Sequence, residues 1–184
     1  MIQEHQAVVN GLDFLVPQIH SVANRMSEAL DDGGKIIWMG NGGSAADSQH
    51  LAAELIGRFK RERRAIASIS LSVDTSVLTA LGNDYGYDTV FRRQIEALCS
   101  EKDVVVGIST SGNSKNVLAA IELAKDIGAY TVGFTGVSGG ELIGQVDACF
   151  PVPSSVTSRI QESHILIGHI ICELVELDVV KLGD

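Results

Sequence analysis

The chain has few cysteines, and their spacing excludes the two roles that clustered cysteines usually play. Three cysteines occur among 184 residues, and no two of them form a C-x-x-C pair. Neither a disulfide framework nor a zinc knuckle is indicated, so each thiol is expected to pack as a small apolar group in a reducing compartment. The residues concerned are Cys99, Cys149 and Cys172.

Basic residues are also scarce, at 14 against 23 acidic residues, which gives a formal net charge of -9. A nucleic-acid-binding surface needs clustered lysine and arginine to displace counterions from phosphates, so we expect no nucleic-acid partner. A small anionic ligand remains compatible with this charge. The sequence also lacks long hydrophobic runs and a basic leader followed by an apolar segment. We therefore expect a globular, cytoplasmic protein with no membrane partner.

Short apolar, β-branched runs alternate with segments of helical periodicity along most of the chain. Continuous apolar strands indicate burial on both faces, as in a parallel sheet covered by helices. The pattern predicts a three-layer α/β/α fold of flavodoxin-like type, with five parallel strands in the order 2-1-3-4-5, in one domain over residues 1–184. The expected strands lie at residues 35–39, 66–71, 103–108, 130–134 and 148–152, and the expected helices at residues 45–59, 75–81, 90–98, 114–127 and 141–143.

The two ends of the chain stand outside this alternation. Residues 1–32 read as a helical segment in which Pro17 marks a break or a new first turn. Residues 158–180 read as one long helix with almost no polar face. A helix this apolar needs more cover than its own sheet supplies, so we expect the terminal helices to lie in a homo-oligomer interface. The alternative is a helix that is buried within a monomer.

Two loops of unusual composition follow the first and third expected strands. Residues 40–44 read Gly-Asn-Gly-Gly-Ser, and residues 109–114 read Ser-Thr-Ser-Gly-Asn-Ser. In a 2-1-3-4-5 sheet these strands are neighbours at the switch point, so both loops would flank one crevice. Hydroxyl groups, backbone amides and a helix N-terminus together can hold a phosphate. The alternative for the second loop is an ordinary Ser/Thr-rich turn in which Ser114 caps the next helix.

Nucleotide sites fit this sequence poorly. The glycine loop satisfies a relaxed form of the G-x-G-x-x-A pattern of dinucleotide-binding sites. Such sites also have an acid about 20 residues later, at the end of the second strand. Glu62 has this spacing but lies in a charged run before that strand, so it matches poorly. No G-x-x-x-x-G-K-[ST] sequence occurs, so a P-loop is not supported.

Candidate acid–base residues lie on the two helices expected near the crevice. His50 and Glu54 are spaced i, i+4 and project from one helix face. On the C-terminal helix, polar residues interrupt the apolar surface at Gln161, Glu162, His164 and His169. A histidine and a carboxylate near a phosphorylated sugar can transfer protons next to a carbonyl, or can ligate zinc. The alternatives are an exposed i, i+4 pair on the first helix and a buried, satisfied histidine on the second.

Five motifs, in order, resemble those of the phosphoheptose isomerase family, which belongs to the sugar isomerase (SIS) fold. They lie at residues 40–50, 53–55, 82–86, 107–114 and 159–162, and the resemblance spans about residues 20–180. It implies an enzyme that interconverts sedoheptulose 7-phosphate and D-glycero-D-manno-heptose 7-phosphate. This reaction is the first step toward nucleotide-activated heptose for surface polysaccharides such as lipopolysaccharide and capsule. The resemblance also implies a homotetramer with active sites between subunits.

The resemblance further implies roles for individual residues. Glu54 and His169 correspond to the acid–base pair, and one Zn²⁺ per subunit would be bound by His50, Glu54, Gln161 and His169. The sugar would contact Asn41, Gly42, Gly43, Ser44, Glu54, Arg58, Asn83, Asp84 and Gln161, and the phosphate would contact Ser109, Thr110, Ser111 and Ser114. Ser158 departs from the family pattern, because some members have an aspartate there.

One spacing bears on the implied metal set. Gln161 and His169 are eight residues apart, which is roughly 12 Å along a helix. To reach one metal they must lean toward each other or come from different subunits.

These residues lead to a hypothesis of aldose–ketose isomerisation through an enediol. The rival hypothesis is a non-catalytic SIS-domain regulator that binds a replication initiator protein; retention of His50, Glu54, Gln161 and His169 favours the enzyme. A glutamine-dependent amidotransferase is disfavoured, because the chain lacks a glutaminase domain and an N-terminal cysteine.

Overall fold

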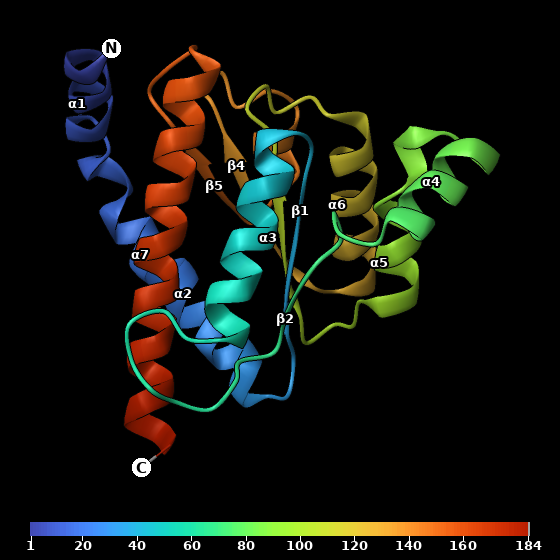
Figure 1. The fold of residues 1–184 in the computed structure, drawn as a ribbon, viewed down its shortest axis with the longest axis horizontal. Helices are drawn as coiled ribbons and strands as arrows, with labels where there is room; N and C mark the ends of the chain where they lie inside the picture. The colour runs from blue at the N-terminus through green and yellow to red at the C-terminus, as the bar shows by residue number, and fades with distance from the viewer. Residues whose placement is uncertain (184) are drawn as a thin grey trace.

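The fold is built on a five-stranded parallel sheet with the strand order β2-β1-β3-β4-β5, as the sequence predicted (Figure 1). A computed structural model describes residues 1–183. The strands are β1 (Ile36–Gly40), β2 (Ser68–Ser70), β3 (Val104–Ile108), β4 (Tyr130–Thr135) and β5 (Ala148–Pro151). The α/β fold class is therefore confirmed, although β2 is shorter than the six residues expected from the sequence.

The central strands form because their apolar side chains are buried on both faces of the sheet. Every residue of β1 and of β3 is buried. The two strands pair in register from Ile36 with Val104 to Gly40 with Ile108. Since both strands end at the same level, the glycine loop and the serine loop leave the sheet side by side.

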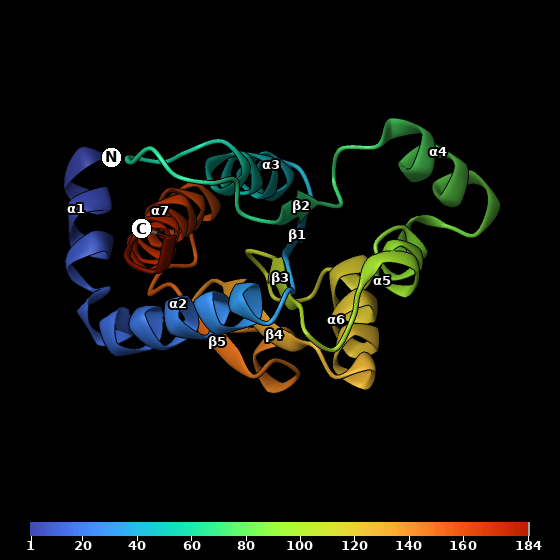
Figure 2. The same cartoon turned by 90° about the horizontal axis from the view of Figure 1, so that it is seen from below.

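Two helical layers cover the sheet (Figure 2). One face packs against α2 (Val16–Asp31), α3 (Gly43–Ile56) and α7 (Thr157–Gly183), and α7 lies against both α2 and α3. The other face packs against α5 (Arg92–Leu98), α6 (Lys115–Ile127) and η3 (Leu142–Gly144). The chain crosses to opposite faces after β1 and after β3, which opens a crevice between their carboxyl ends.

Two helices project from this body. The helix α4 (Thr75–Asp84) packs mainly against η2 (Tyr87–Thr89) and extends beyond the β2 edge (Figures 1 and 2). The helix α1 (Ile2–Asn10) lies on the outer side of α7. All residues of α1 and α4 are at least partly exposed in this single chain.

The N-terminal segment is helical, and Pro17 marks a new first turn, one of the two expected alternatives. The short helix η1 (Asp13–Leu15) separates α1 from α2, so the break precedes Pro17. Pro17 lies in the first turn of α2, where its missing N–H costs nothing. Among residues 1–183, none of the helices combines the length and apolar character needed to cross a bilayer.

His164 attaches α7 to the end of β4 from inside the core. Its Nε2 donates a hydrogen bond to the Thr135 carbonyl at 3.0 Å, and its ring lies edge-on to Phe134 with centroids 5.5 Å apart. Its Nδ1 is buried and has no hydrogen-bond partner among residues 1–183. Burial lowers the pKa of His164 to about 4, although the bond to Thr135 opposes this shift. The imidazole is therefore neutral at pH 7.

A buried neutral histidine makes stability fall in acid, because the unfolded chain binds the proton more tightly. The unfolded side chain titrates near 6.5 and the folded one near 4, so the free energy of unfolding should fall by about 3 kcal/mol across that window. We expect urea unfolding at pH 7 and at pH 4 to show that wild type loses about 3 kcal/mol more free energy of unfolding over this range than His164→Gln does. The exposed His20→Gln serves as control, and a pH-independent difference would contradict the prediction.

Candidate active site

The glycine loop turns the chain from β1 into α3. Gly42 has a positive φ of 56°, a conformation that side chains with a Cβ rarely adopt. A Cβ on Gly40 would lie 2.6 Å from the Ser44 carbonyl oxygen, so the turn also needs glycine where β1 ends. The helix α3 thus starts directly at the sheet edge, with its positive dipole end facing the crevice.

The serine loop follows β3 and presents a cluster of hydroxyl groups. Ser109 Oγ lies 2.9 Å from Ser114 Oγ and 3.4 Å from Ser111 Oγ. Ser114 is the N-cap residue of α6, but its hydroxyl pairs with Ser109 where the sequence had suggested a helix cap. Gly112 has φ of 69° and packs directly on the backbone of Gly139, so the loop following β4 supports this cluster.

A reciprocal amide pair joins the two loops. Asn41 Nδ2 donates to Asn116 Oδ1, and Asn116 Nδ2 donates to Asn41 Oδ1, both at 2.9 Å. Asn116 is buried in the first turn of α6 and also accepts the Val117 amide at 3.0 Å. Sequence reasoning missed Asn116, and its only signal was its place two residues after the serine loop.

A cavity of about 330 Å³ adjoins the serine loop on the side of β4 and β5. Most of its lining side chains carry hydroxyl groups, which suits a polyhydroxylated ligand. Besides the expected Thr110 and Ser111, the lining includes Ser138, Ser154, Ser155 and Thr157, which the sequence did not single out.

Two histidines and a glutamate meet where α3 packs on α7. His50 Nε2 lies 2.9 Å from His169 Nε2 and 3.3 Å from Glu54 Oε1. The three candidate ligand atoms lie within 4.8 Å of one another. The helices run side by side in the same direction, since Gly43 lies against Gln161 near both helix starts and Leu51 lies against Gly168 further along both. The sequence separates His169 from His50 by more than 100 residues, yet the fold brings them together.

The chemistry of this cluster fits a divalent metal. Two imidazoles and one carboxylate form a donor set used by catalytic zinc sites, which keep one further position open. Solvent reaches the cluster, because the side chains of His50 and Glu54 are 49% and 21% exposed. Burial lowers the pKa of His169, as do His50 and Lys60, while Glu54 opposes them. The neutral imidazole thus favoured is the form that binds a metal or accepts a proton.

Asp47 lies one turn before His50 on α3 and was also missed. Burial raises the pKa of its carboxyl to about 6, although the nearby His50 lowers it. Asp47 Oδ2 is buried without a hydrogen-bond partner within the described chain. An acid in the first half of a helix carries little signal in a sequence, because most such residues are solvated.

Comparisons with known proteins show the family to which the chain belongs. Residues 5–136 match the model of the family described as "SIS domain". The phosphoheptose isomerase of Geobacter metallireducens is 54% identical over 181 residues, which cover 98% of this chain and 96% of the relative. The chain belongs to the phosphoheptose isomerase family. The structure of the family member from Neisseria gonorrhoeae superposes with a TM-score of 0.90 at 41% identity, covering 96% of this chain and 95% of that one.

Other residues implied by the family resemblance are not all near this cluster in one chain. Gln161 contacts Gly43 so closely that a Cβ at residue 43 would overlap its amide group, which places Gln161 at the glycine loop. His169 lies about two turns further along α7, so the backbone of Gln161 is roughly 12 Å from that of His169 along the helix.

Three further residues implied by the family resemblance lie on exposed segments of this chain. Arg58 is exposed in the segment after α3, with Nε 3.7 Å from Glu62 Oε2. Asn83 donates to Asp84 Oδ1 at 2.7 Å at the exposed end of α4, which projects away from the crevice (Figure 1).

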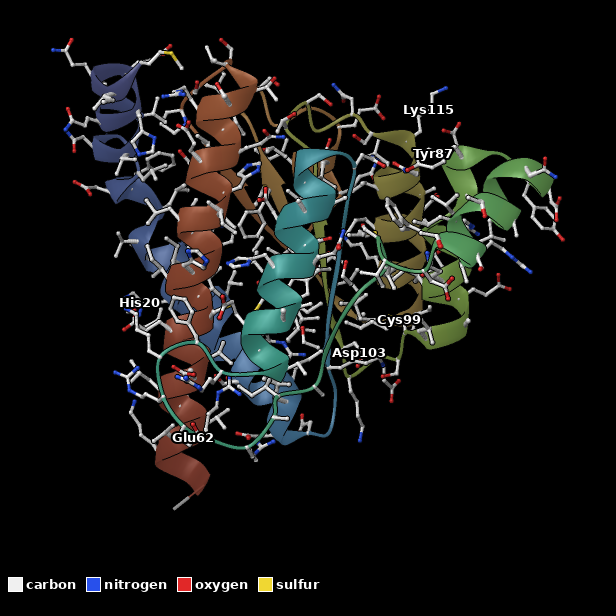
Figure 3. The ribbon with its side chains drawn as sticks, viewed as in Figure 1. His20, Glu62, Tyr87, Cys99, Asp103 and Lys115 are labelled. Carbon is white, nitrogen blue, oxygen red and sulfur yellow. The ribbon has the colours of Figure 1, made fainter. Side chains whose placement is uncertain are left out.

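The metal-binding capacity of the cluster can be tested on chelator-treated protein. We expect one Zn²⁺ or Co²⁺ per chain by calorimetric titration, and we expect His50→Ala to weaken binding at least about tenfold because one ligand is lost. His20→Ala is the matched control, since His20 is exposed on α2 (Figure 3). Binding by His50→Ala as tight as that of wild type would show that the cluster is not the metal site.

Proposed function

We propose that this chain is an aldose–ketose isomerase that converts sedoheptulose 7-phosphate to D-glycero-D-manno-heptose 7-phosphate. Relatives of that name match it over nearly its whole length. The observation that carries the proposal is that His50 and Glu54, on the helix that starts at the glycine loop, meet His169 of α7. The serine loop, with its cluster of hydroxyl groups, leaves the sheet beside that glycine loop. The two loops suit a phosphate, and the cluster of His50, Glu54 and His169 suits proton transfer.

The phosphate end would be held without a basic patch. Ser109, Thr110, Ser111 and Ser114 would donate hydroxyl or amide hydrogens to the phosphate oxygens, at the N-terminus of α6. Asn41, Gly42, Gly43 and Ser44 would line the adjoining side of the crevice. Fixing the phosphate in this way places the far end of the sugar, which is what an intramolecular proton transfer requires.

Glu54 and His169 would carry the chemistry. One of them removes a proton from C1 of the ketose while the C2 oxygen gains a proton, which forms the enediol. Return of a proton to C2, with loss of the proton from the C1 oxygen, then yields the aldose. No other co-substrate is consumed, so the sum of the steps is an isomerisation.

A zinc ion, one per subunit, would be held by His50, Glu54 and His169, with Gln161 as the fourth ligand. When bound, such an ion polarises the carbonyl and hydroxyl oxygens and stabilises the enediolate. Because Gln161 lies at the glycine loop of its own chain, we propose that a homotetramer completes the set between subunits. The same assembly would bring Arg58, Asn83 and Asp84 to a neighbouring crevice.

The cellular setting follows from the reaction. We propose a cytoplasmic enzyme that supplies the first step of nucleotide-activated heptose synthesis for surface polysaccharide. The rival proposal is a regulator that binds a replication initiator, which does not need an acid–base pair. Convergence of the two histidines with Glu54 favours the enzyme.

Turnover of sedoheptulose 7-phosphate, followed as aldose formation with and without a chelator, tests the proposal. Glu54→Gln keeps the shape of the side chain but cannot accept the proton, so we expect at least a ~100-fold loss of kcat. Glu96→Gln, an exposed change on α5, should retain wild-type turnover.

Two outcomes would contradict the assignment. Near-normal turnover by folded Glu54→Gln would remove Glu54 from the chemistry. Absence of turnover by the wild type in both conditions, together with binding to a replication initiator protein, would favour the regulator.

A further inference from the structure

The segment that joins α3 to β2 is the most basic part of an acidic chain. Residues 57–67 carry a single acid, Glu62, among five basic residues, which are Arg58, Lys60, Arg61, Arg63 and Arg64. Like charges this dense repel one another, so the segment is not expected to hold a fixed shape alone. The first half of this segment nevertheless lies along α7, as Figures 1 and 3 show.

Glu176 on α7 fixes the main chain of this segment. Its carboxylate is fully buried and accepts hydrogen bonds from the amides of Phe59 and Lys60, both at 2.9 Å, and of Arg61 at 3.0 Å. Arg63 Nε lies 3.2 Å away as an ion-pair partner. Burial alone would raise the pKa of Glu176, but the amides and Arg63 lower it below its ordinary value. The ionised carboxylate therefore sets where the backbone of residue 59 lies.

That backbone position places the Phe59 ring on His169. The two ring centroids are 5.2 Å apart, and the ring planes differ by 23°. The His50 ring also packs edge-on against the His169 ring, with ring centroids 5.1 Å apart and ring planes at 69° to each other. The imidazole of His169 is thus held between a flat face and an edge, with its Nε2 directed at His50 Nε2.

We propose that Phe59, held in place by Glu176, is a positioning residue that orients the His169 imidazole toward His50 and Glu54. This role in catalysis rests on the proposed isomerase function, whereas the orientation of the ring does not. The torsion that turns an imidazole about its Cβ–Cγ bond has broad minima, so a neighbouring face is needed to select one angle. A stacked ring supplies this selection, and an aliphatic side chain of similar volume does not.

Three substitutions separate positioning from space filling. Phe59→Leu keeps most of the apolar volume and removes the flat face, whereas Phe59→Tyr keeps the face. Glu176→Gln replaces one carboxylate oxygen with an NH₂ group. This group is a donor and cannot accept hydrogen bonds from the backbone amides that the carboxylate holds. Glu173→Gln is the matched control, because Glu173 lies one turn earlier on α7 and pairs, within the described residues, with the side chains of Lys60 and Arg61 and with no backbone amide.

The first readout is the Cε1–H resonance of His169 in histidine-labelled protein, assigned by its loss in His169→Gln. We expect the Phe59 ring current to shift this resonance upfield in the wild type and in Phe59→Tyr and Glu173→Gln. The shift should be lost in Phe59→Leu and reduced in Glu176→Gln.

The second readout is Co²⁺ affinity followed by its visible absorption, and the third is turnover. We expect Phe59→Leu to weaken Co²⁺ binding and to lower kcat by about 10–100-fold each, as for other residues that orient a ligand. The KM should change less than about twofold, since the phosphate is held at the serine loop. Phe59→Tyr should restore all three readouts.

An unshifted His169 resonance in the wild type would overturn the proposal, as would Phe59→Leu with wild-type Co²⁺ affinity. Equal losses in Phe59→Leu and Phe59→Tyr would do the same, because they indicate a purely structural contact. If Glu176→Gln does not fold, the two Phe59 variants still decide the question. If the wild type does not isomerise the sugar, the proposed function fails while the resonance and Co²⁺ measurements still test the orientation of His169.

Discussion

The close approach of α3 to α7 is the contact on which the rest of the site depends. Two glycines make it possible, one on each helix: a Cβ on Gly168 would lie 2.5 Å from Leu51 Cδ1, and a Cβ on Gly43 would overlap Gln161. Leu51 is fully buried, and protein interiors are close-packed. With these glycines the helices run at a distance where His50 and His169 can share a hydrogen bond.

Charge is distributed in this molecule so that an anion can bind to an acidic protein. Three of the five basic side chains after α3, those of Lys60, Arg61 and Arg63, are paired with Glu173 or Glu176. The crevice instead offers hydroxyl groups and two helix N-termini, which attract a phosphate through dipoles rather than net charge. Such a site can select a small phosphorylated molecule and still repel a polyanion.

Much of this arrangement could be predicted from local sequence, because it depends on local rules. The alternation of apolar strands with helical segments predicted a parallel sheet covered by helices, and the compositions of residues 40–44 and 109–114 identified the two loops. The i, i+4 spacing of His50 and Glu54 was enough to place them on one face. Asn116, Phe59 and Glu176 were not predicted, since each acts through a partner far away in the sequence. Arg58, Asn83 and Asp84 were named only through family resemblance, and no local rule places them relative to the crevice.

The two edges of the sheet limit how this chain can associate. At one edge β2 is only three residues long, and at the other β5 ends in Pro151, which has no N–H to offer a further strand. Short edge strands and edge prolines are two ways in which proteins prevent strand-to-strand aggregation. Ordered assembly is thereby left to the helical surfaces, where α1 and α4 stand exposed.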